Sequence, residues 1–188
     1  MKVVAVMGSP RKKGTSARIA AAFLEEARKE GAEISTYHLN RMDFRGCQGC
    51  SACKEKLEQC ALKDDLTPLL EEMDTADVTV FASPVYFYDV SGQFKCFFDR
   101  TYSLLKPDFM TNPAPSRLAP GKKALLVIAQ GDEGEEKHKE LVGKYHLFLT
   151  LYGYDAKVIL ATGLGVDAKA DVSAWTEEAQ ALAREMAV

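Results

Sequence analysis

A run of small, hydroxyl-bearing and basic residues at positions 8 to 16 carries the clearest chemical signal in the chain. It follows an almost entirely apolar segment at 1–7 and precedes a stretch with helical periodicity. Helix starts offer unpaired N–H groups that bind anions, and hydroxyl and guanidinium groups add further donors. The loop therefore predicts a monophosphate site; the alternative is a flexible loop with an ordinary serine or threonine cap. The candidate residues are Ser9, Pro10, Arg11, Gly14, Thr15 and Ser16.

Four of the five cysteines lie in one short segment with the spacing C-x2-C-x2-C-x6-C. Four thiolates from such a segment suit a [4Fe–4S] cluster. Zinc is a second candidate, although structural zinc sites more often divide their ligands between two separated pairs. Metal-free thiols on a lid are the third. Cys96 stands apart and is expected to pack in the core. The candidate ligands are Cys47, Cys50, Cys53 and Cys60.

Two other phosphate motifs are excluded by their context. The P-loop needs a lysine before its final serine or threonine, but Gly14 precedes Thr15, so nucleoside triphosphate hydrolysis is not expected. A G-x-G-x-x-A pattern at 163–168 follows an apolar run. Only about one helix of chain lies beyond it, so no later strand could carry the ribose-binding acid of a dinucleotide site. We expect a turn there.

Length and composition predict one globular domain over residues 1–188. The hydrophobic content is 47%, the charged content 27% and the net charge −3, which leaves no large basic surface for nucleic acid. No signal pattern and no run of membrane-spanning length is present. We therefore expect a cytoplasmic protein that binds neither nucleic acid nor membrane, with cysteines that serve as thiols, metal ligands or redox groups.

Apolar runs alternate with amphipathic stripes along the chain. Continuous apolar runs at 3–7, 78–82, 124–129 and 158–161 indicate strands buried on both faces, whereas alternation at 33–39 indicates an edge strand. This order predicts an α/β, flavodoxin-like, doubly wound fold: five parallel strands in the order 2-1-3-4-5, with helices on both faces. Helical periodicity is present at 19–27, 66–73, 94–105, 141–152 and 175–186.

The third predicted strand leads into an aromatic-rich loop at 83–92. In the 2-1-3-4-5 order this loop lies beside the phosphate loop, where the strand order reverses and ligands bind. Aromatic rings and backbone polar groups suit a flat ligand; the alternative is that the rings only cap the core or line a subunit contact. The candidate contacts are Ser83, Pro84, Val85, Tyr86 and Phe87.

Taken in order, these motifs resemble the NAD(P)H-dependent FMN reductases, in particular the branch that contains the iron–sulfur flavoproteins. The matching segments cover most of residues 1–105; they are 8–16, the four cysteines with Asp64-Asp65, 83–87 and 91–100. The resemblance implies FMN, with its phosphate on Ser9, Arg11, Thr15 and Ser16. Its ring would lie along 84–87, and the loop at 130–134, which includes Gly131, would approach the ring from the other side.

The resemblance also implies an oxidoreductase that passes electrons from NAD(P)H through FMN to a small acceptor such as a flavin or a quinone. Such chemistry requires no acid, base or nucleophile side chain, so no catalytic residue is named. The alternative is an iron–sulfur electron carrier that exchanges electrons with a ferredoxin-like protein, and a non-redox binding protein is the third. The family usually completes its flavin pocket across a subunit interface, which implies a homo-oligomer, a dimer or tetramer. Leu147 and Leu151, beside the main stripe of their helix, support this.

Overall fold

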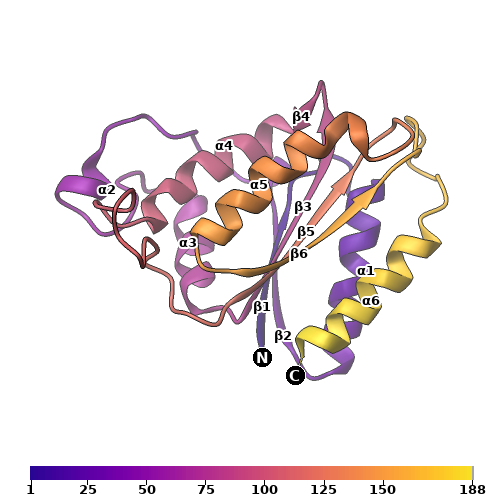
Figure 1. Ribbon diagram of the computed structural model, residues 1–188, viewed down its shortest axis with the longest axis horizontal. Coiled ribbons are helices and arrows are strands. Elements are labelled where there is room, and N and C mark those ends of the chain that lie inside the picture. Colours follow the sequence, from indigo (N-terminus) through magenta and orange to yellow (C-terminus); the bar gives the residue numbers. More distant parts are fainter. Residues whose placement is uncertain (188) are drawn as a thin grey trace.

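Five parallel strands form the central sheet. They are β1 (Lys2–Met7), β2 (Glu33–His38), β3 (Val78–Tyr86), β5 (Lys123–Ala129) and β6 (Asp155–Ala161). The structure, a computed structural model, describes residues 1–187. The strands are ordered β2-β1-β3-β5-β6 (Figure 1), which confirms the predicted 2-1-3-4-5 order once a short additional strand between the third and fourth is set aside.

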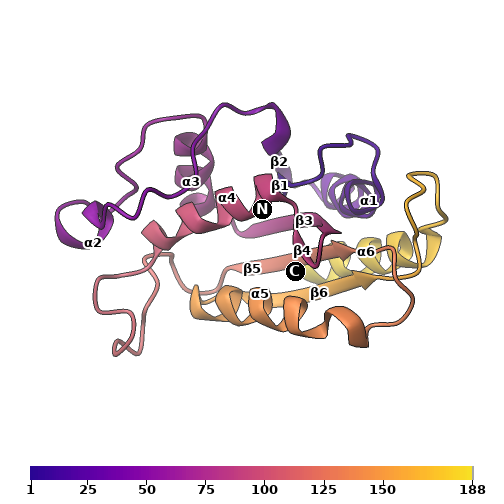
Figure 2. The ribbon, with the colours of Figure 1, turned by 90° about the horizontal axis from the view of Figure 1, so that it is seen from above.

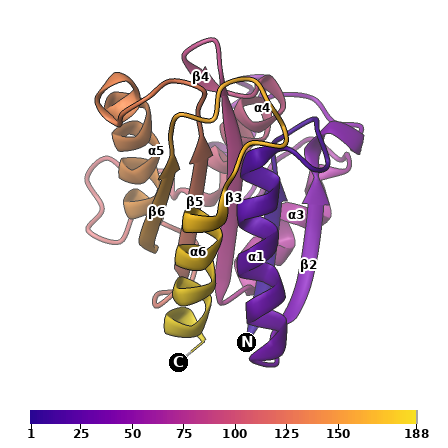
Figure 3. The same ribbon diagram turned by 90° about the vertical axis from the view of Figure 1, so that its right-hand side faces the viewer.

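Helices cover both faces of this sheet. The α-helices are α1 (Thr15–Lys29), α2 (Ala52–Glu55), α3 (Leu66–Thr75), α4 (Gly92–Arg100), α5 (Lys139–Leu151) and α6 (Ser173–Met186). Short 3₁₀ helices are η1 (Leu39–Arg41), η2 (Thr101–Leu104) and η3 (Glu136–His138). α1 and α6 lie side by side over one face (Figure 3), while α3, α4 and α5 pack on the other.

Side chains that alternate along the buried strands divide the interior into two apolar cores. In β1, Val3 and Ala5 belong to the core beneath α1 and α6, whereas Val4 and Val6 belong to the core beneath α3, α4 and α5. All four side chains are fully buried. A strand covered on both faces therefore needs apolar residues at every position, and this explains the continuous runs in the sequence.

The chain after Ser83 differs from the predicted loop. β3 continues to Tyr86, and the two-residue strand β4 (Asp89–Val90) pairs antiparallel with its end. Phe87 and Tyr88 form the turn of this hairpin, with φ values of 46° and 66°. Val90 of β4 is buried in the core beneath α3, α4 and α5. This burial explains why β3 continues to pair, with β4, beyond the end of the parallel sheet.

Two details of α4 also differ from expectation. The stripe at 94–105 is not one helix: α4 ends at Arg100 and η2 continues it. The Thr101 hydroxyl donates to the Phe98 carbonyl at 2.6 Å and tightens this last turn. Cys96, expected in the core, is exposed, because α4 directs its phenylalanines rather than its thiol toward the sheet.

Several irregular segments join these elements. Residues 163–168 form a turn, as predicted, with Gly163 and Gly165 at positive φ. The cysteine segment, residues 45–64, projects beyond the sheet beside the loop at 106–121 (Figure 2). No helix within residues 1–187 is long and apolar enough to cross a lipid bilayer.

Candidate functional site

The loops that follow β1, β3 and β5 meet at the carboxyl edge of the sheet, at the top of Figure 3. The Gly8 amide donates to the Ala82 carbonyl at 2.7 Å, and the Ser91 hydroxyl donates to the Gly8 carbonyl, also at 2.7 Å. Ser91 also caps α4, because its hydroxyl accepts from the Phe94 amide. The loops after β1 and β3 are therefore joined by hydrogen bonds, as their predicted proximity requires.

Hydrogen bonds to the backbone of Arg11 hold the loop after β1 in a compact turn. The Ser9 Oγ accepts from the Arg11 amide at 3.2 Å and donates to the Arg11 carbonyl at 3.1 Å. The Gly14 amide donates to that same carbonyl at 3.0 Å. A Cβ on Gly14 would lie 2.9 Å from the Ser9 Oγ. A larger residue at position 14 would therefore displace the hydroxyl from the concave side of the loop.

Ser16 has a buried hydroxyl without a protein partner. The residue is 1% exposed, and its Oγ makes no hydrogen bond among residues 1–187. No side chain caps the start of α1 at Gly14 either. A buried, unpaired hydroxyl is unfavourable by about 1–3 kcal/mol, so its presence beside free helix N–H groups points to an acceptor supplied from outside the chain. A phosphate fits this arrangement.

Other residues of the predicted phosphate site lie at its rim. Thr15 is buried beside Ser16, whereas Pro10 and Arg11 are exposed. The Arg11 Nη1 donates to the Val166 carbonyl at 3.2 Å, so its guanidinium reaches across to the turn after β6. The exposed position leaves this cation free to meet an anion that arrives from solvent.

The aromatic-rich segment that begins at Ser83 is buried at its start and exposed at Phe87. The Ser83 hydroxyl is fully buried and links the strand to Ser91, whose amide donates to it at 3.0 Å. Ser83 is therefore a structural member of the predicted ring site. Tyr86 is half-exposed and Phe87 is 99% exposed. An aromatic side chain so open to solvent is available for a ligand or a second subunit.

The loop after β5 was predicted to approach the ring through Gly131. Gly131 is exposed, and its carbonyl accepts from the Gly165 amide at 3.1 Å. The preceding residue, Gln130, is buried and donates to the Gly134 carbonyl at 2.6 Å, while its Oε1 has no partner among the described residues. Gln130 belongs to the loop that was predicted to approach the ring, although only Gly131 was singled out as a contact. The signal for Gln130 was a polar side chain at the end of an otherwise apolar strand.

A polar cluster joins this loop to the hairpin turn. The His138 Nε2 lies 3.1 Å from the Asp132 Oδ2, and Lys137 donates to the same carboxylate at 2.7 Å. Hydrogen bonds from Lys137 and His138 lower the pKa of Asp132 below its usual value. The Tyr88 ring packs on His138, with 5.5 Å between centroids. No sequence pattern indicated this cluster, because Tyr88 lies far from the other three residues along the chain.

The four cysteines of the cysteine segment line one small cavity of about 50 Å³. Cys47 and Cys50 are exposed, while Cys53 and Cys60 are half-buried. Burial raises the pKa of Cys53. Within residues 1–187, no group of three or more His, Cys, Asp or Glu side chains is arranged to hold a metal ion. A [4Fe–4S] cluster needs a different arrangement of ligands, because each of its four thiolates binds a different iron.

Cationic side chains hold the cysteine segment in place. The Lys54 amine donates to the carbonyls of Tyr102 and Leu105, both at 2.6 Å. The Arg117 Nη2 donates to the Cys53 carbonyl at 3.1 Å. Arg100, fully buried at the end of α4, binds residues at both ends of the segment. Arg100 was not predicted as a functional residue; its signal in the sequence was a cation at the end of an aromatic-rich helical stripe.

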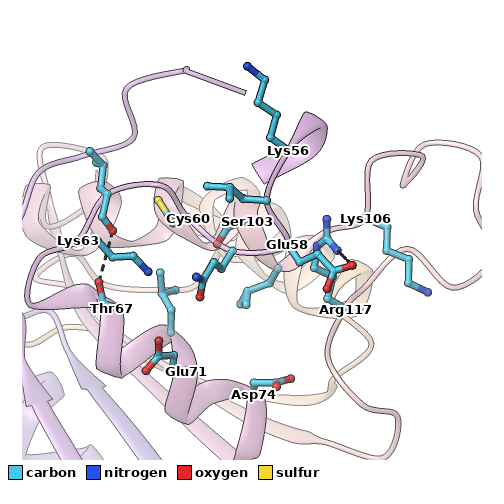
Figure 4. A pocket seen from close by; sticks show the side chains of 15 residues that line it. Lys56, Glu58, Cys60, Lys63, Thr67, Glu71, Asp74, Ser103, Lys106 and Arg117 are labelled. Atoms are coloured by element: carbon cyan, nitrogen blue, oxygen red, sulfur yellow. Dashed lines mark hydrogen bonds and ion pairs between the residues drawn. The ribbon is translucent and has the colours of Figure 1, made fainter. Parts of the chain in front are cut away.

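A larger cavity of about 760 Å³ lies between the cysteine segment and α3 (Figure 4). Glu71 and Asp74 approach it from α3, and Arg117 and Lys106 lie on another side. None of the predicted phosphate or ring residues lines it. Cys60, Leu62 and Ser103 line both cavities, so the large cavity adjoins the small one.

Comparison with known proteins agrees with this geometry. The fold is flavodoxin-like. A crystal structure of an FMN-dependent NADH-azoreductase from Bacillus anthracis, in complex with FMN, has a TM-score of 0.78 at 15% sequence identity, over 100% of both chains. A family model described as NADPH-dependent FMN reductase matches residues 1–171. The chain belongs to the NADPH-dependent FMN reductase family.

The curated relatives of the chain include iron–sulfur flavoproteins and a quinone oxidoreductase. An iron–sulfur flavoprotein of Archaeoglobus fulgidus is 37% identical over 100 residues, which are 53% of this chain and 45% of the relative. One of Methanosarcina thermophila is 34% identical over 109 residues, 58% of this chain and 56% of the relative. An FMN-dependent NADH:quinone oxidoreductase of Yersinia pestis is 30% identical over 141 residues, which are 72% of this chain and 69% of the relative. The chain thus spans about half the length of these two iron–sulfur flavoproteins.

Proposed function

We propose that the chain binds FMN at the carboxyl edge of its sheet and transfers electrons from NAD(P)H to a small acceptor such as a flavin or a quinone. The observation that carries this proposal is the buried, unpartnered Ser16 hydroxyl at the start of α1. Membership in the NADPH-dependent FMN reductase family supports the same cofactor and the same reaction class. Bound FMN supplies the group that accepts a hydride and passes on its electrons.

The residues of the chain hold and orient this cofactor. Hydroxyls, the Arg11 guanidinium and helix N–H groups bind the phosphate, while Pro10 and Gly14 shape the loop around it. The end of β3 supports the ring, and the β5 loop, which packs closely against Gly165 through Gly131, approaches the ring from the other side. The phosphate donors are Ser9, Arg11, Thr15 and Ser16. The ring contacts are Pro84, Val85, Tyr86 and Phe87, with Ser83 as their internal anchor.

A spectrum of the purified protein tests the proposal. We expect flavin absorption bands, or stoichiometric FMN uptake by the apoprotein. Weaker uptake of riboflavin is expected because riboflavin lacks the phosphate that the α1 loop binds. Steady-state oxidation of NADH and of NADPH with a quinone then identifies the donor. Absence of flavin bands together with no FMN uptake would refute the proposal.

A second candidate function rests on the cysteines. All four line one cavity, and the Archaeoglobus and Methanosarcina relatives are named iron–sulfur flavoproteins. We propose that Cys47, Cys50, Cys53 and Cys60 bind a [4Fe–4S] cluster, which would make the protein an electron carrier for a ferredoxin-like partner. Anaerobic reconstitution tests this through iron and sulfide analysis, and fewer than about three irons per chain would exclude a cubane. Rapid NAD(P)H turnover favours the reductase; reduction by ferredoxin without such turnover favours the carrier.

We also propose a homo-oligomer, a dimer or tetramer, formed by one domain over residues 1–188. Of the two leucines that suggested association, Leu147 is 66% exposed and supports it, whereas Leu151 packs against the core beneath α5; Phe148, 38% exposed, adds to the apolar surface. The shared sheet between both cores supports one domain, although Val188 lies outside the described residues. Light scattering and a single cooperative unfolding transition test these proposals. The cytoplasmic location stays a prediction, which cell fractionation would test.

A further inference from the structure

Arg100 is the largest fully buried side chain within residues 1–187 and contacts both ends of the cysteine segment. A guanidinium without contact to water must satisfy its five N–H donors within the protein. Arg100 does so with five hydrogen bonds. Its acceptors are the Sγ of Cys60, both carboxylate oxygens of Asp64, and the carbonyls of Arg45 and Leu62.

These acceptors lie at both ends of the cysteine segment. Arg45 comes two residues before Cys47, and its carbonyl accepts from the Arg100 Nη1 at 2.8 Å. Leu62 comes two residues after Cys60, and its carbonyl accepts from Nη2 at 3.3 Å. One side chain thus joins the entry and exit of the segment, and it fixes the separation between the first and the last of the four cysteines.

The fifth donor of Arg100 reaches sulfur. The Arg100 Nε lies 3.0 Å from the Cys60 Sγ. A thiol sulfur is a weak acceptor, whereas an anionic sulfur that binds a cation or a cluster is a strong one. Neither Lys54 nor Arg117 makes such a contact, since both donate to backbone carbonyls. Arg100 is therefore distinguished by a direct bond to a candidate ligand atom.

We infer that Arg100 is a positioning residue that holds Cys60 as the fourth ligand of the cluster and, by its N–H···S bond, raises the reduction potential of that cluster. The inference rests on the proposed [4Fe–4S] site. Reduction adds negative charge that is shared with the cysteine sulfurs, so a donor to sulfur stabilises the reduced state more than the oxidised state. Loss of the donor should lower the potential even where four irons remain bound.

The experiment compares wild type, Arg100→Lys, Arg100→Met and the control Arg117→Met after anaerobic reconstitution. Arg117 contacts the same segment through the Cys53 carbonyl and through an ion pair with Glu58, but it donates to no cysteine sulfur. Iron per chain and the midpoint potential, followed by electron paramagnetic resonance, are the readouts; bound FMN and far-ultraviolet circular dichroism report folding. We expect about four irons in wild type and Arg117→Met, with equal potentials. We expect Arg100→Lys to keep most of its iron at a lower potential, because the amine keeps the charge and lacks the Nε donor.

The outcomes separate the inference from the proposal beneath it. A folded Arg100→Met protein that loses iron but keeps FMN supports the positioning role. If Arg100→Met does not fold, the potential of Arg100→Lys decides. Wild-type potential and iron content in the folded Arg100 variants would overturn the inference alone. Wild type that takes up no iron would instead overturn the cluster and, with it, the inference.

Discussion

Gly131 and Gly165 pack backbone against backbone at the carboxyl edge of the sheet. A Cβ on Gly131 would lie 2.8 Å from the Gly165 carbonyl oxygen, closer than real Cβ atoms approach. The Gly165 amide also donates to the Gly131 carbonyl at 3.1 Å. Neither contact involves a flexible side chain that could move aside. The loops after β5 and β6 therefore have one close arrangement, and it requires glycine at position 131.

Gly131→Ala should displace these two loops. We expect a loss of about 1–3 kcal/mol in the free energy of unfolding and weaker FMN binding. Denaturant unfolding and FMN titration measure both effects. The control is Gly143→Ala on the exposed face of α5, where a Cβ meets nothing within 4 Å. Alanine there should stabilise the protein by about 0.5–1 kcal/mol. Equal stability of the two variants would contradict the prediction.

Ser16→Ala tests the phosphate site directly. Removal of the buried hydroxyl should weaken FMN binding by about 10- to 150-fold, because a hydrogen bond to a charged group contributes about 1.5–3 kcal/mol. Riboflavin affinity should not change, since riboflavin has no phosphate. Ser173→Ala, an exposed serine at the start of α6 that is not among the proposed phosphate donors, is the matched variant and should leave both affinities unchanged. An equal loss for FMN and riboflavin would place the phosphate elsewhere.

Phe87→Asn should stabilise the protein. Phe87 is 99% exposed at φ 46°, a conformation that is unfavourable for a bulky residue and that asparagine tolerates in hairpin turns. We expect a gain of about 1 kcal/mol in the free energy of unfolding of the apoprotein, with weaker FMN binding. The control Met110→Asn removes an apolar side chain that is 82% exposed without changing a strained position. A gain of the same size in the control would mean that exposure, not backbone strain, is the cause.

Acid should weaken the Asp64–Arg100 pair. Burial alone would raise the pKa of Asp64, but hydrogen bonds from Arg100 and from backbone amides outweigh it and hold the pKa below the usual value. The folded state therefore binds this proton less readily than the unfolded state. The stabilisation is present above about pH 4 and is lost as the pH falls through the lowered pKa.

Asp64→Asn isolates this contribution. We expect a loss of about 3 kcal/mol at pH 7, because the buried Arg100 loses its counter-ion. Between pH 5 and pH 3, the free energy of unfolding should fall less steeply in Asp64→Asn than in wild type. Asp155→Asn, at an exposed position on β6, is the control and should follow wild type. Parallel pH profiles of wild type and Asp64→Asn would contradict the assignment.

The sheet could be predicted because the signal for each strand lies within a short stretch of sequence. A strand covered on both faces must be apolar throughout, so β1, β3 and β5 were evident as short apolar runs, and the alternation in β2 indicated an edge. The phosphate loop was evident for a similar reason: hydroxyl, glycine and basic residues directly precede a helical stripe. Both signals arise within about ten neighbouring residues.

Other features depend on contacts between distant residues. The bond between Arg100 and Cys60 forms only once α4 has packed beneath the cysteine segment. The β4 hairpin carries Phe87 and Tyr88 at positive φ, where glycine, asparagine or aspartate would have indicated a turn. Tertiary packing overrides the local backbone preference of these two residues, so no sequence pattern predicted the hairpin.

The position of α4 has a consequence for the distance between the two proposed redox centres. The helix begins beside Ser91, which is bonded to the loop after β1, and ends at Arg100, which is bonded to the cysteine segment. Nine helical residues span about 13 Å. Electron tunnelling rates fall steeply with separation. A helix of this length would hold the two proposed sites at a constant separation within one subunit, and that separation would limit the rate of any electron exchange between them.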